Sequence, residues 1–331
     1  MNHKLCCIGY ITRDKIVTPD NTVYMPGGTA FYFAKAISRL QAEGFLLVSA
    51  LAEEDKAAAE EIIREGIEVK LVPTTHSHSF ENIYGDNPNE RRQRVTAQAA
   101  PFRVADLEDV RADIIHLGTL LADDFSLDVI RHLAGRSTLA ADVQGFLRKV
   151  ECEKVYAVDW EEKREALRYI HTLKANENEM EVLTGCAEPH EAALLIADWG
   201  VKTVLLTLGD KGSLIYTAGQ FYDIPAYPTL QVVDATGCGD TYMAGYLYKR
   251  SQGASHQEAG CFAAAMCTLK LQAHGPFNGT EAMVNSIIGK RLHALYNKKG
   301  VEISTPSYYM HILIVFAECV STTNNIRSAV T

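Results

Sequence analysis

The sequence lacks any long hydrophobic run and any recognisable secretory leader. Its apolar stretches, such as Ile312–Ala317, are far shorter than the ~20 residues that span a bilayer. The residues after Met1 show none of the charged start, apolar stretch or small-residue cleavage site of a signal peptide. We therefore expect a soluble, cytoplasmic protein whose mature chain begins at Met1 and which has no membrane partner.

Clusters of positive charge are also scarce. The formal net charge is -9, and the densest basic segment is Arg91–Arg94. We interpret this segment as a solvated edge strand, with contact to an anionic substrate as the alternative. Because no larger basic footprint is visible, no nucleic-acid partner is expected.

Paired cysteines are absent as well. The eight cysteines are scattered, several of them lie in apolar segments, and no CxxC pair occurs. This pattern is typical of reduced, buried thiols in a cytosolic enzyme, and it does not predict a disulfide framework or a zinc site.

What the sequence does contain is a regular alternation of apolar runs and amphipathic segments. Short apolar or β-branched runs predict strands at residues 4–9, 45–51, 114–117, 138–143, 172–175 and 203–207. Helical spacing predicts helices between them, for example at Thr29–Gln41, Ser126–Ala134 and Glu191–Gly200. The alternation favours an α/β fold with a mostly parallel sheet and helices on both faces.

Two segments do not follow this alternation. Lys15–Met25 and His78–Phe102 are polar and β-prone, with turn-like centres at Pro19–Asn21 and Gly85–Asn89. They predict strands or a hairpin that projects from the core and covers a site, and a pair of mobile surface loops is the alternative. The last residues, 291–331, have no evident pattern, and we interpret them as an appendage of unknown role.

The strongest chemical signal is the segment Asp234–Asp240, which reads DATGCGD. Gly237 and Gly239 permit a tight turn, and an apolar-periodic segment from Thr241 then begins a helix. Backbone N–H groups at a helix start, together with the helix dipole, form a site for anionic oxygens. Asp240 could then accept the proton of a hydroxyl that attacks a phosphoryl group, and a simple helix N-cap is the alternative.

At this point the sequence resembles the ribokinase-like (PfkB) carbohydrate kinase family, whose signature is D-T-x-G-A-G-D before a helix. The matching residues are Asp234, Thr236, Gly237, Gly239 and Asp240, and Cys238 replaces the usual Ala. The resemblance implies an ATP-dependent kinase for a hydroxyl of a sugar or polyol. It also implies that Gly237, Cys238 and Gly239 form an anion hole and that Asp240 is the catalytic base.

Two elements near the amino terminus fit the same family. Gly27 and Gly28 precede a helix where the family has a glycine pair, and paired glycines allow close approach of the backbone to a ligand. Asp14 follows the first strand where the family places an Asp that binds substrate hydroxyls. The resemblance therefore implies substrate binding by Asp14, Gly27 and Gly28, whereas a helix-entry turn and a turn-capping Asp are the alternatives.

Elements further along resemble the family's donor site. Asn176 and Glu179 match an N-x-x-E element, so Glu179 would hold Mg²⁺ through water and Asn176 would lie at the nucleotide. Thr207, Gly209 and Gly212 match a nucleotide-contacting T-L-G-x-x-G, for which a plain β-hairpin is the alternative.

The sequence departs from the sugar kinases of the family at two positions, where Thr12 and Tyr32 replace asparagines. The stretch Asp142–Arg148 instead looks like the D-x-Q-x-x-x-R of the inositol-kinase branch, so Gln144 and Arg148 are expected to bind substrate. A myo-inositol kinase is therefore one alternative for the substrate.

The sequence is also compatible with a nucleoside kinase and with a binding protein that has no activity. A nucleoside kinase would stack its base on Phe80 or Tyr84 of the lid. A family member that has lost turnover would act as a sugar-binding regulator. A Rossmann dehydrogenase is disfavoured because no G-x-G-x-x-G follows the first strand.

The resemblance extends over about residues 4–285. It implies a kinase domain at 1–290 with the ribokinase-like three-layer fold and a small β lid from about 13–26 and 78–102, followed by the appendage at 291–331. Monovalent-cation activation by K⁺ is common in the family and would involve the loop near Asp234 and Gly275. Exposed lid strands in the family often pair between subunits, so a homodimer through the lid is also expected.

Overall fold

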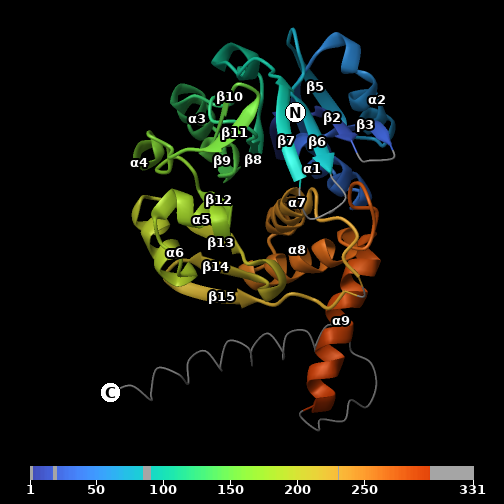
Figure 1. The fold of residues 1–331 in the computed structure, drawn as a ribbon. Helices are drawn as coiled ribbons and strands as arrows, with labels where there is room; N and C mark the ends of the chain where they lie inside the picture. Colours follow the sequence, from blue (N-terminus) through green and yellow to red (C-terminus); the bar gives the residue numbers. More distant parts are fainter. Residues whose placement is uncertain (1–2, 18–20, 85–90, 230, 299–331) are drawn as a thin grey trace. The chain divides into compact units, whose positions relative to one another are not determined.

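The computed structural model describes residues 3–17, 21–84, 91–229 and 231–298. The chain divides into two compact units, Met1–Val284 and Asn285–Thr331. The first unit contains both sheets and nearly all of the helices (Figure 1). Of the expected appendage, only the end of helix α9 (Glu281–Lys298) falls within the described residues.

A nine-stranded sheet forms the centre of the first unit, in the order β15-β14-β13-β12-β9-β8-β1-β4-β5. Seven neighbouring strands, from β13 to β5 in this order, pair in parallel. Strand β14 pairs antiparallel with β13, and β15 pairs antiparallel with β14. Their bounds are β1 (His3–Tyr10), β4 (Phe45–Leu51), β5 (Glu68–Pro73), β8 (Ala112–Gly118), β9 (Thr138–Asp142), β12 (Thr172–Asn176), β13 (Thr203–Thr207), β14 (Ser213–Thr217) and β15 (Gln220–Ile224). The predicted α/β fold with a mostly parallel sheet is confirmed.

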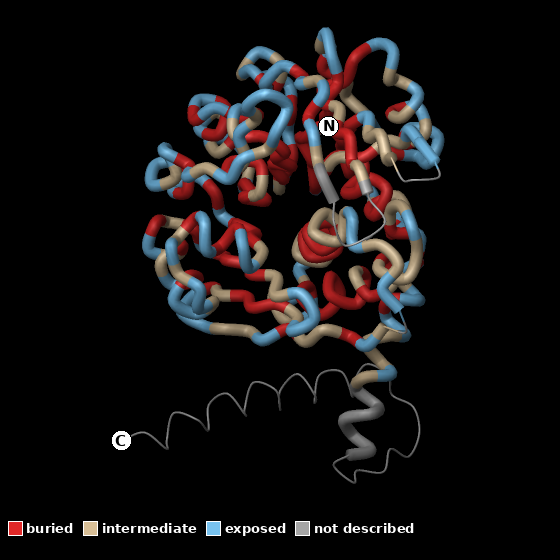
Figure 2. The backbone as a smooth tube through the Cα atoms, in the orientation of Figure 1, coloured by how far each residue is buried: buried red, intermediate tan, exposed pale blue. Residues whose placement is uncertain are grey.

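Helices cover the two faces of this sheet. Helices α1 (Gly28–Arg39), α7 (Cys238–Ser251) and α8 (His256–Lys270) pack against one another and against β1, β14 and β15. The other helices are α2 (Ala57–Arg64), α3 (Leu127–Ala134), α4 (Lys163–Ala166), α5 (Glu177–Thr184) and α6 (Pro189–Asp198). Figure 2 shows the buried stretches on the central strands and on α7. Strand β4 is buried along its whole length, as expected for a parallel strand covered on both faces.

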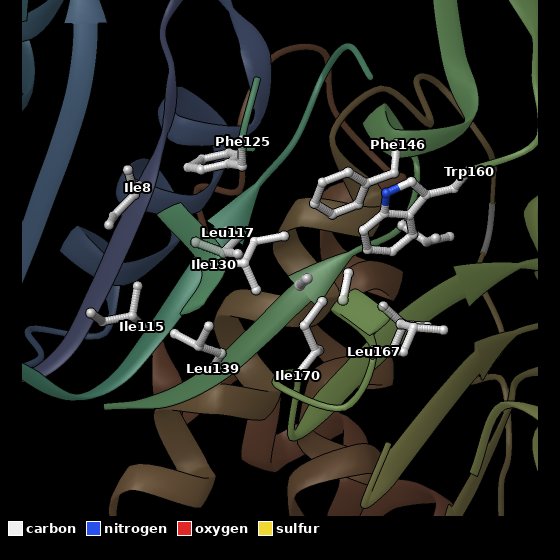
Figure 3. Packing of buried hydrophobic residues seen from close by; sticks show 14 of the residues in the cluster. Ile8, Ile115, Leu117, Phe125, Ile130, Leu139, Phe146, Trp160, Leu167 and Ile170 are labelled. Atoms are coloured by element: carbon white, nitrogen blue, oxygen red, sulfur yellow. The ribbon is translucent and has the colours of Figure 1, made fainter. Parts of the chain in front are cut away.

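One large hydrophobic cluster fills the space between the sheet and helices α3 to α6. Figure 3 shows part of it, with Ile8, Leu117 and Leu139 from the strands, Ile130 from α3 and Leu167 next to α4. Successive side chains of a strand point to opposite faces. Cys6 and Ile8 of β1 accordingly join this cluster, whereas Cys7 between them is buried toward α7. The sheet is thus a rigid base for the residues at its strand ends.

The two segments that broke the alternation form strands, as predicted. They contribute β2 (Thr12–Val17), β3 (Thr22–Gly27), β6 (Ser79–Tyr84) and β7 (Arg91–Ala97) to a second, six-stranded sheet of order β10-β11-β7-β6-β2-β3. We call this second sheet the lid sheet. Residues 18–20 and 85–90, within the two predicted turn centres, lie outside the described residues.

The remaining two lid strands were not predicted. A hairpin of β10 (Arg148–Glu151) and β11 (Lys154–Ala157) leaves the core after β9 and pairs with β7, where Lys154 lies opposite Arg94. Strand β7 therefore lies between β11 and β6. The interpretation of Arg91–Arg94 as an edge strand is corrected at Arg94, which pairs with Lys154 of a hairpin from a distant part of the sequence.

No helix among the described residues is both long and apolar enough to cross a membrane.

Candidate active site

The glycine turn of the DATGCGD motif opens directly into helix α7. Gly237 is the N-cap with φ 77°, a left-handed conformation that favours glycine, and the helix begins at Cys238, three residues earlier than predicted. The Cys238 N–H donates to Ala235 O at 3.1 Å. Helix geometry leaves the N–H groups of the first turn, including those of Gly239 and Asp240, without an intrahelical acceptor. This end of α7 can therefore bind an anion.

Close packing explains the glycine at 237. A Cβ atom there would lie 2.3 Å from the ring of Tyr32, so only glycine fits. Tyr32 is buried on α1, at one of the two positions where the sugar kinases carry asparagine. The ring therefore packs against the turn. This contact explains the role of Tyr32, which the sequence showed only as a departure from the asparagine of the sugar kinases.

Asp240 lies half-buried at the end of this turn, where its carboxylate accepts a hydrogen bond from Thr29 of α1. Burial and the nearby carboxylate of Asp142 raise the pKa of Asp240 from 3.8 to about 6, although Lys174 and Thr29 act in the opposite direction. A carboxyl group with this pKa is mostly ionised at neutral pH and holds a proton more readily than an ordinary aspartate. It is therefore suited to general-base catalysis.

A buried ion pair faces the turn from the strand ends. Lys174 of β12 donates to Asp142 of β9 at 2.5 Å, and the two residues are direct neighbours in the parallel register. Burial alone would lower the pKa of Lys174, but Asp142 and Glu179 outweigh it and raise the pKa. A Cβ atom on Gly239 would lie 3.2 Å from Lys174 Nζ, so this glycine lets the turn approach the ammonium.

Sequence reasoning assigned no role to Lys174. The signal that could have found it is a lysine inside an otherwise apolar strand, two residues before Asn176. A lysine that is almost fully buried needs a partner charge, which Asp142 supplies, and here its positive charge lies next to the glycine turn.

Asn176 and Glu179 form a capping box at the start of α5. Asn176 Oδ1 accepts from the Glu179 N–H at 2.9 Å, and Glu179 Oε2 accepts from the Asn176 N–H at 2.8 Å. Glu179 Oε1 has a longer contact, 3.4 Å, from Gln144 Nε2. Burial and the charge of Asp142 raise the pKa of Glu179. Because the cap already uses most of these oxygen atoms, the pair suits a metal held through water better than one bound directly.

Residues expected to bind the acceptor divide between two places. Asp14 Oδ1 accepts from the Thr12 hydroxyl at 2.7 Å, and a Cβ atom on Gly27 would lie 2.4 Å from Asp14 Oδ2. Gly28 has φ +83°, and a Cβ there would meet Tyr10 O at 2.4 Å. Asp14, Gly27 and Gly28 therefore lie together at the junction of the lid sheet and α1.

Gln144 and Arg148 lie at Glu179 instead. Gln144 contacts the Glu179 carboxylate, and the charge of Arg148 opposes the rise that burial produces in the pKa of that same group. These two residues thus belong to the strand ends beside Asp142, where β9 leads into β10.

The predicted nucleotide residues line one large cavity of about 780 Å³. Asn176, Thr207, Gly209 and Gly212 all lie in its wall, together with Cys238 and Gly239 of the turn. The sequence did not point to the other residues of the lining, which include Tyr227, Val232, Tyr242, Ala264, Thr268 and Leu271. The residues that line the cavity thus extend from the β13–β14 connection to the first turn of α7.

Gly212 in this wall also needs to be glycine. It has φ 98°, and a Cβ atom there would lie only 2.1 Å from Ile224 O. The tight connection between the antiparallel strands β13 and β14 therefore depends on this residue.

Comparison with known proteins assigns the chain to a family of small-molecule kinases. The model of the pfkB family carbohydrate kinases matches residues 2–283, and the chain belongs to this family. The protein is a kinase that transfers a phosphoryl group to a hydroxyl of a sugar-like or nucleoside acceptor.

Individual relatives differ in donor and acceptor. A cytidine kinase of Thermococcus kodakarensis is 25% identical over 265 residues, 77% of this chain and 91% of the relative. A solved pyrophosphate-dependent kinase of the ribokinase family, complexed with a pyrophosphate analogue and myo-inositol, is 27% identical with a TM-score of 0.76, covering 85% of this chain and 99% of the other. Arabidopsis thaliana ribokinase, complexed with ribose and ATP, has the same fold with a TM-score of 0.72 at 23% identity, over 87% and 99% of the two chains.

Proposed function

We propose that this kinase uses ATP as donor and phosphorylates a hydroxyl of a sugar or polyol, with myo-inositol the first acceptor to test. The observation that carries the choice of donor is the size of the cavity that ends at Cys238 and Gly239. Its volume, about 780 Å³, is in the range of pockets that enclose nucleotide-sized ligands. Pyrophosphate would occupy only a small part of it.

The cavity wall supports a nucleoside in the donor. Residues such as Val232, Ala264 and Leu271 offer apolar surface to a base, whereas Thr207 and Asn176 offer polar groups nearer the turn. A binding site of this kind, mostly apolar with a few polar groups, suits the amphipathic structure of a nucleotide.

The acceptor would lie between Asp14 and Asp240. A carboxylate can accept hydrogen bonds from two neighbouring hydroxyls, which favours a polyol at Asp14. The relative complexed with myo-inositol supports a cyclic polyol. A nucleoside acceptor is the second candidate, because the Thermococcus relative is a cytidine kinase. Phe80, one of two lid aromatics considered for stacking a base, is buried in the hydrophobic cluster, and the side chain of Tyr84 lies outside the described residues.

In the proposed mechanism, Asp240 accepts the proton of the attacking hydroxyl. The resulting oxygen attacks the terminal phosphorus of the donor, and the bond from that phosphorus to the leaving phosphate oxygen breaks. The first-turn amides of α7 and the Lys174 ammonium stabilise the negative charge on the transferred group. Asp142 holds Lys174 in position through the buried ion pair.

The donor set at α5 fits a magnesium ion held through water by Glu179, with Asn176 beside the nucleotide. When bound, Mg²⁺ would neutralise part of the donor's phosphate charge. The protein's own contribution is the capping box, which fixes the Glu179 carboxylate against Asn176, a residue that lines the cavity.

A donor and acceptor matrix tests the proposed function. Purified protein is assayed with ATP, GTP and pyrophosphate against ribose, fructose, 2-keto-3-deoxygluconate, adenosine, cytidine and myo-inositol, and the phosphorylated product is identified by mass spectrometry. We expect turnover with ATP and a polyol or sugar. Transfer from pyrophosphate but not from ATP would overturn the donor assignment, and binding of an acceptor without transfer from any donor would favour a non-catalytic regulator.

We further propose a cytoplasmic homodimer formed through the lid sheet. Strand β3 is the edge of that sheet, and Val23 and Tyr24 on it are 46% and 58% exposed. An edge strand with apolar side chains is a template for pairing with a second strand. Light scattering of the wild type and of Tyr24→Lys distinguishes a dimer from a monomer. A dimer that forms through this edge should dissociate in the variant.

A further inference from the structure

A fully buried lysine lies behind the anion-binding turn. Lys270 is the last residue of α8, and its side chain is 0% exposed. Its ammonium donates to the Asp234 carbonyl oxygen at 2.8 Å and to Asp234 Oδ2 at 2.9 Å. Asp234 is the first residue of the DATGCGD segment, so a buried positive charge is fixed at the start of the turn that ends in Asp240.

The Asp234 carboxylate connects this charge to two loops. Its Oδ1 accepts from the Thr236 N–H at 2.8 Å, inside the turn, and its Oδ2 accepts from the Gly275 N–H at 3.3 Å. Burial alone would raise the pKa of Asp234, but the hydrogen bonds from Thr236 and Lys270 outweigh it and lower the pKa. The carboxylate is therefore held ionised, and the conformation of the turn depends on the network around it.

This network does not fit a monovalent cation near Asp234 and Gly275, the loop that would be involved in the cation activation common in the family. A free K⁺ needs oxygen acceptors that face it, whereas the two Asp234 oxygens here already accept from the Lys270 ammonium. The Gly275 amide also points a donor at Oδ2. A second cation at these oxygens would be repelled by Lys270.

We propose that the Lys270 ammonium is a built-in cation that holds the turn before Asp240 in its active conformation, so that phosphoryl transfer requires no added monovalent cation. Lys270 is a positioning residue: it acts on the anion-binding amides through Asp234 and Thr236. The charge of Lys270 also acts on the turn itself. The pKa of Cys238 is lowered mainly by a hydrogen bond from Cys267, and the charge of Lys270 contributes to the same decrease against the effect of burial. The proposal rests on the kinase activity but not on a particular donor or acceptor.

The first test needs no variant. Turnover of the wild type, with whichever donor and acceptor pair is active, is measured in KCl, NaCl and choline chloride at constant ionic strength. Equal rates in the three salts are expected. Turnover that requires K⁺ would overturn the proposal, whereas absence of turnover in every salt and with every pair would contradict the proposed function instead. In that second case, calorimetric binding of ADP or of pyrophosphate, whichever binds, is compared in KCl and in choline chloride. Equal affinities are expected, and binding that requires K⁺ would overturn the role of Lys270.

The second test removes the ammonium. In choline chloride, Lys270→Ala should lose about tenfold or more of its turnover, because a buried carboxylate without its charged partner costs that much or more. Space left by the side chain should then admit a small cation, so K⁺ or NH₄⁺ should restore activity and choline should not. Lys270→Met, which fills the space without charge, should lose activity without such a rescue.

A structural role alone would not produce a rescue that depends on the size of the cation. Lys249→Ala is the matched control, since Lys249 of α7 forms an ion pair with Glu281 at 2.5 Å but does not contact Asp234. It should show no cation dependence. Full activity of Lys270→Ala in choline chloride, or the same cation response in Lys249→Ala, would refute the proposal. If Lys270→Ala does not fold, the wild-type salt series and the ligand titrations still show whether the site requires an added monovalent cation.

Discussion

The half-buried carboxylate of Asp240 should lower the stability of the fold at neutral pH while it supports turnover. Its pKa is about 6 in the folded protein against a usual value of 3.8. A shift of about two pKa units corresponds to roughly 3 kcal/mol at about 1.4 kcal/mol per unit. Asp240→Asn removes this charge and keeps an oxygen that can accept from Thr29. The variant should therefore be more stable than the wild type by up to about 3 kcal/mol at pH 7.

The difference should depend on pH in a defined direction. A raised folded-state pKa means that the folded protein binds the proton more tightly than the unfolded chain. The contribution of Asp240 to the free energy of unfolding is thus most favourable below about pH 4, and it declines as the pH rises to about 6. Asp240→Asn lacks this decline, so the stability gap should open between about pH 4 and pH 6 and stay constant above.

Urea denaturation at a series of pH values measures this gap, and turnover is measured on the same samples. Asp240→Asn should retain nucleotide binding and lose turnover by ~10²-fold or more, because a general base is removed. Asp223→Asn, at an exposed position of β15, is the control and should change neither quantity.

Two results would refute this reasoning. A variant that is no more stable than the wild type at pH 7, or whose gain persists unchanged at pH 4, would show that Asp240 carries no penalty for its buried charge. Turnover close to that of the wild type would show that another group takes the proton.

Three further predictions concern the same turn. The value of kcat/KM should fall about tenfold per pH unit below about pH 6 as Asp240 takes up a proton, and a profile that stays flat to about pH 5 would contradict its role as base. Gly237→Ala should destabilise the protein and reduce turnover, because the new Cβ would meet the Tyr32 ring at 2.3 Å, as urea denaturation and an activity assay would show. Alkylation of Cys238 by iodoacetamide, followed by mass spectrometry, should be slowed by ATP, because Cys238 lines the cavity.

Matched controls are available within the chain for two of these. Gly253 also has a positive φ, +84°, but a Cβ there would meet nothing within 4 Å, so Gly253→Ala isolates the backbone cost from the contact with the ring. Equal destabilisation by both substitutions would rule out the steric argument. Cys152 is exposed on the β10–β11 hairpin, and its alkylation should not respond to ATP. Equal protection of both cysteines would rule out protection by occupancy of the cavity.

Features that depend on neighbours in the sequence could be predicted. Apolar and β-branched runs located the central strands, because the period of a strand is set by its own residues. The DATGCGD segment predicted a turn and a helix start, because glycine spacing and helix geometry are local properties. The helix nevertheless begins at Cys238, since Gly237 in the left-handed conformation already serves as its cap.

Features that depend on distant partners were missed. The pairing of Lys174 with Asp142 arises because β12 and β9 are neighbours in the sheet, and no pattern in either strand indicates which strand lies beside it. The β10–β11 hairpin joins the lid sheet through a contact with β7 that is also remote in sequence.

The sequence by itself determined the alternation of strands and helices, the glycine turn and the position of a carboxylate at its end, because these follow from residue spacing along a single segment. Only the tertiary structure decided that Asp240 is half-buried beside Asp142 and Lys174, and that Lys270 bonds to Asp234. The physical reason is that charges and cavities are shared among segments, so their energies depend on which parts of the chain the sheet brings together.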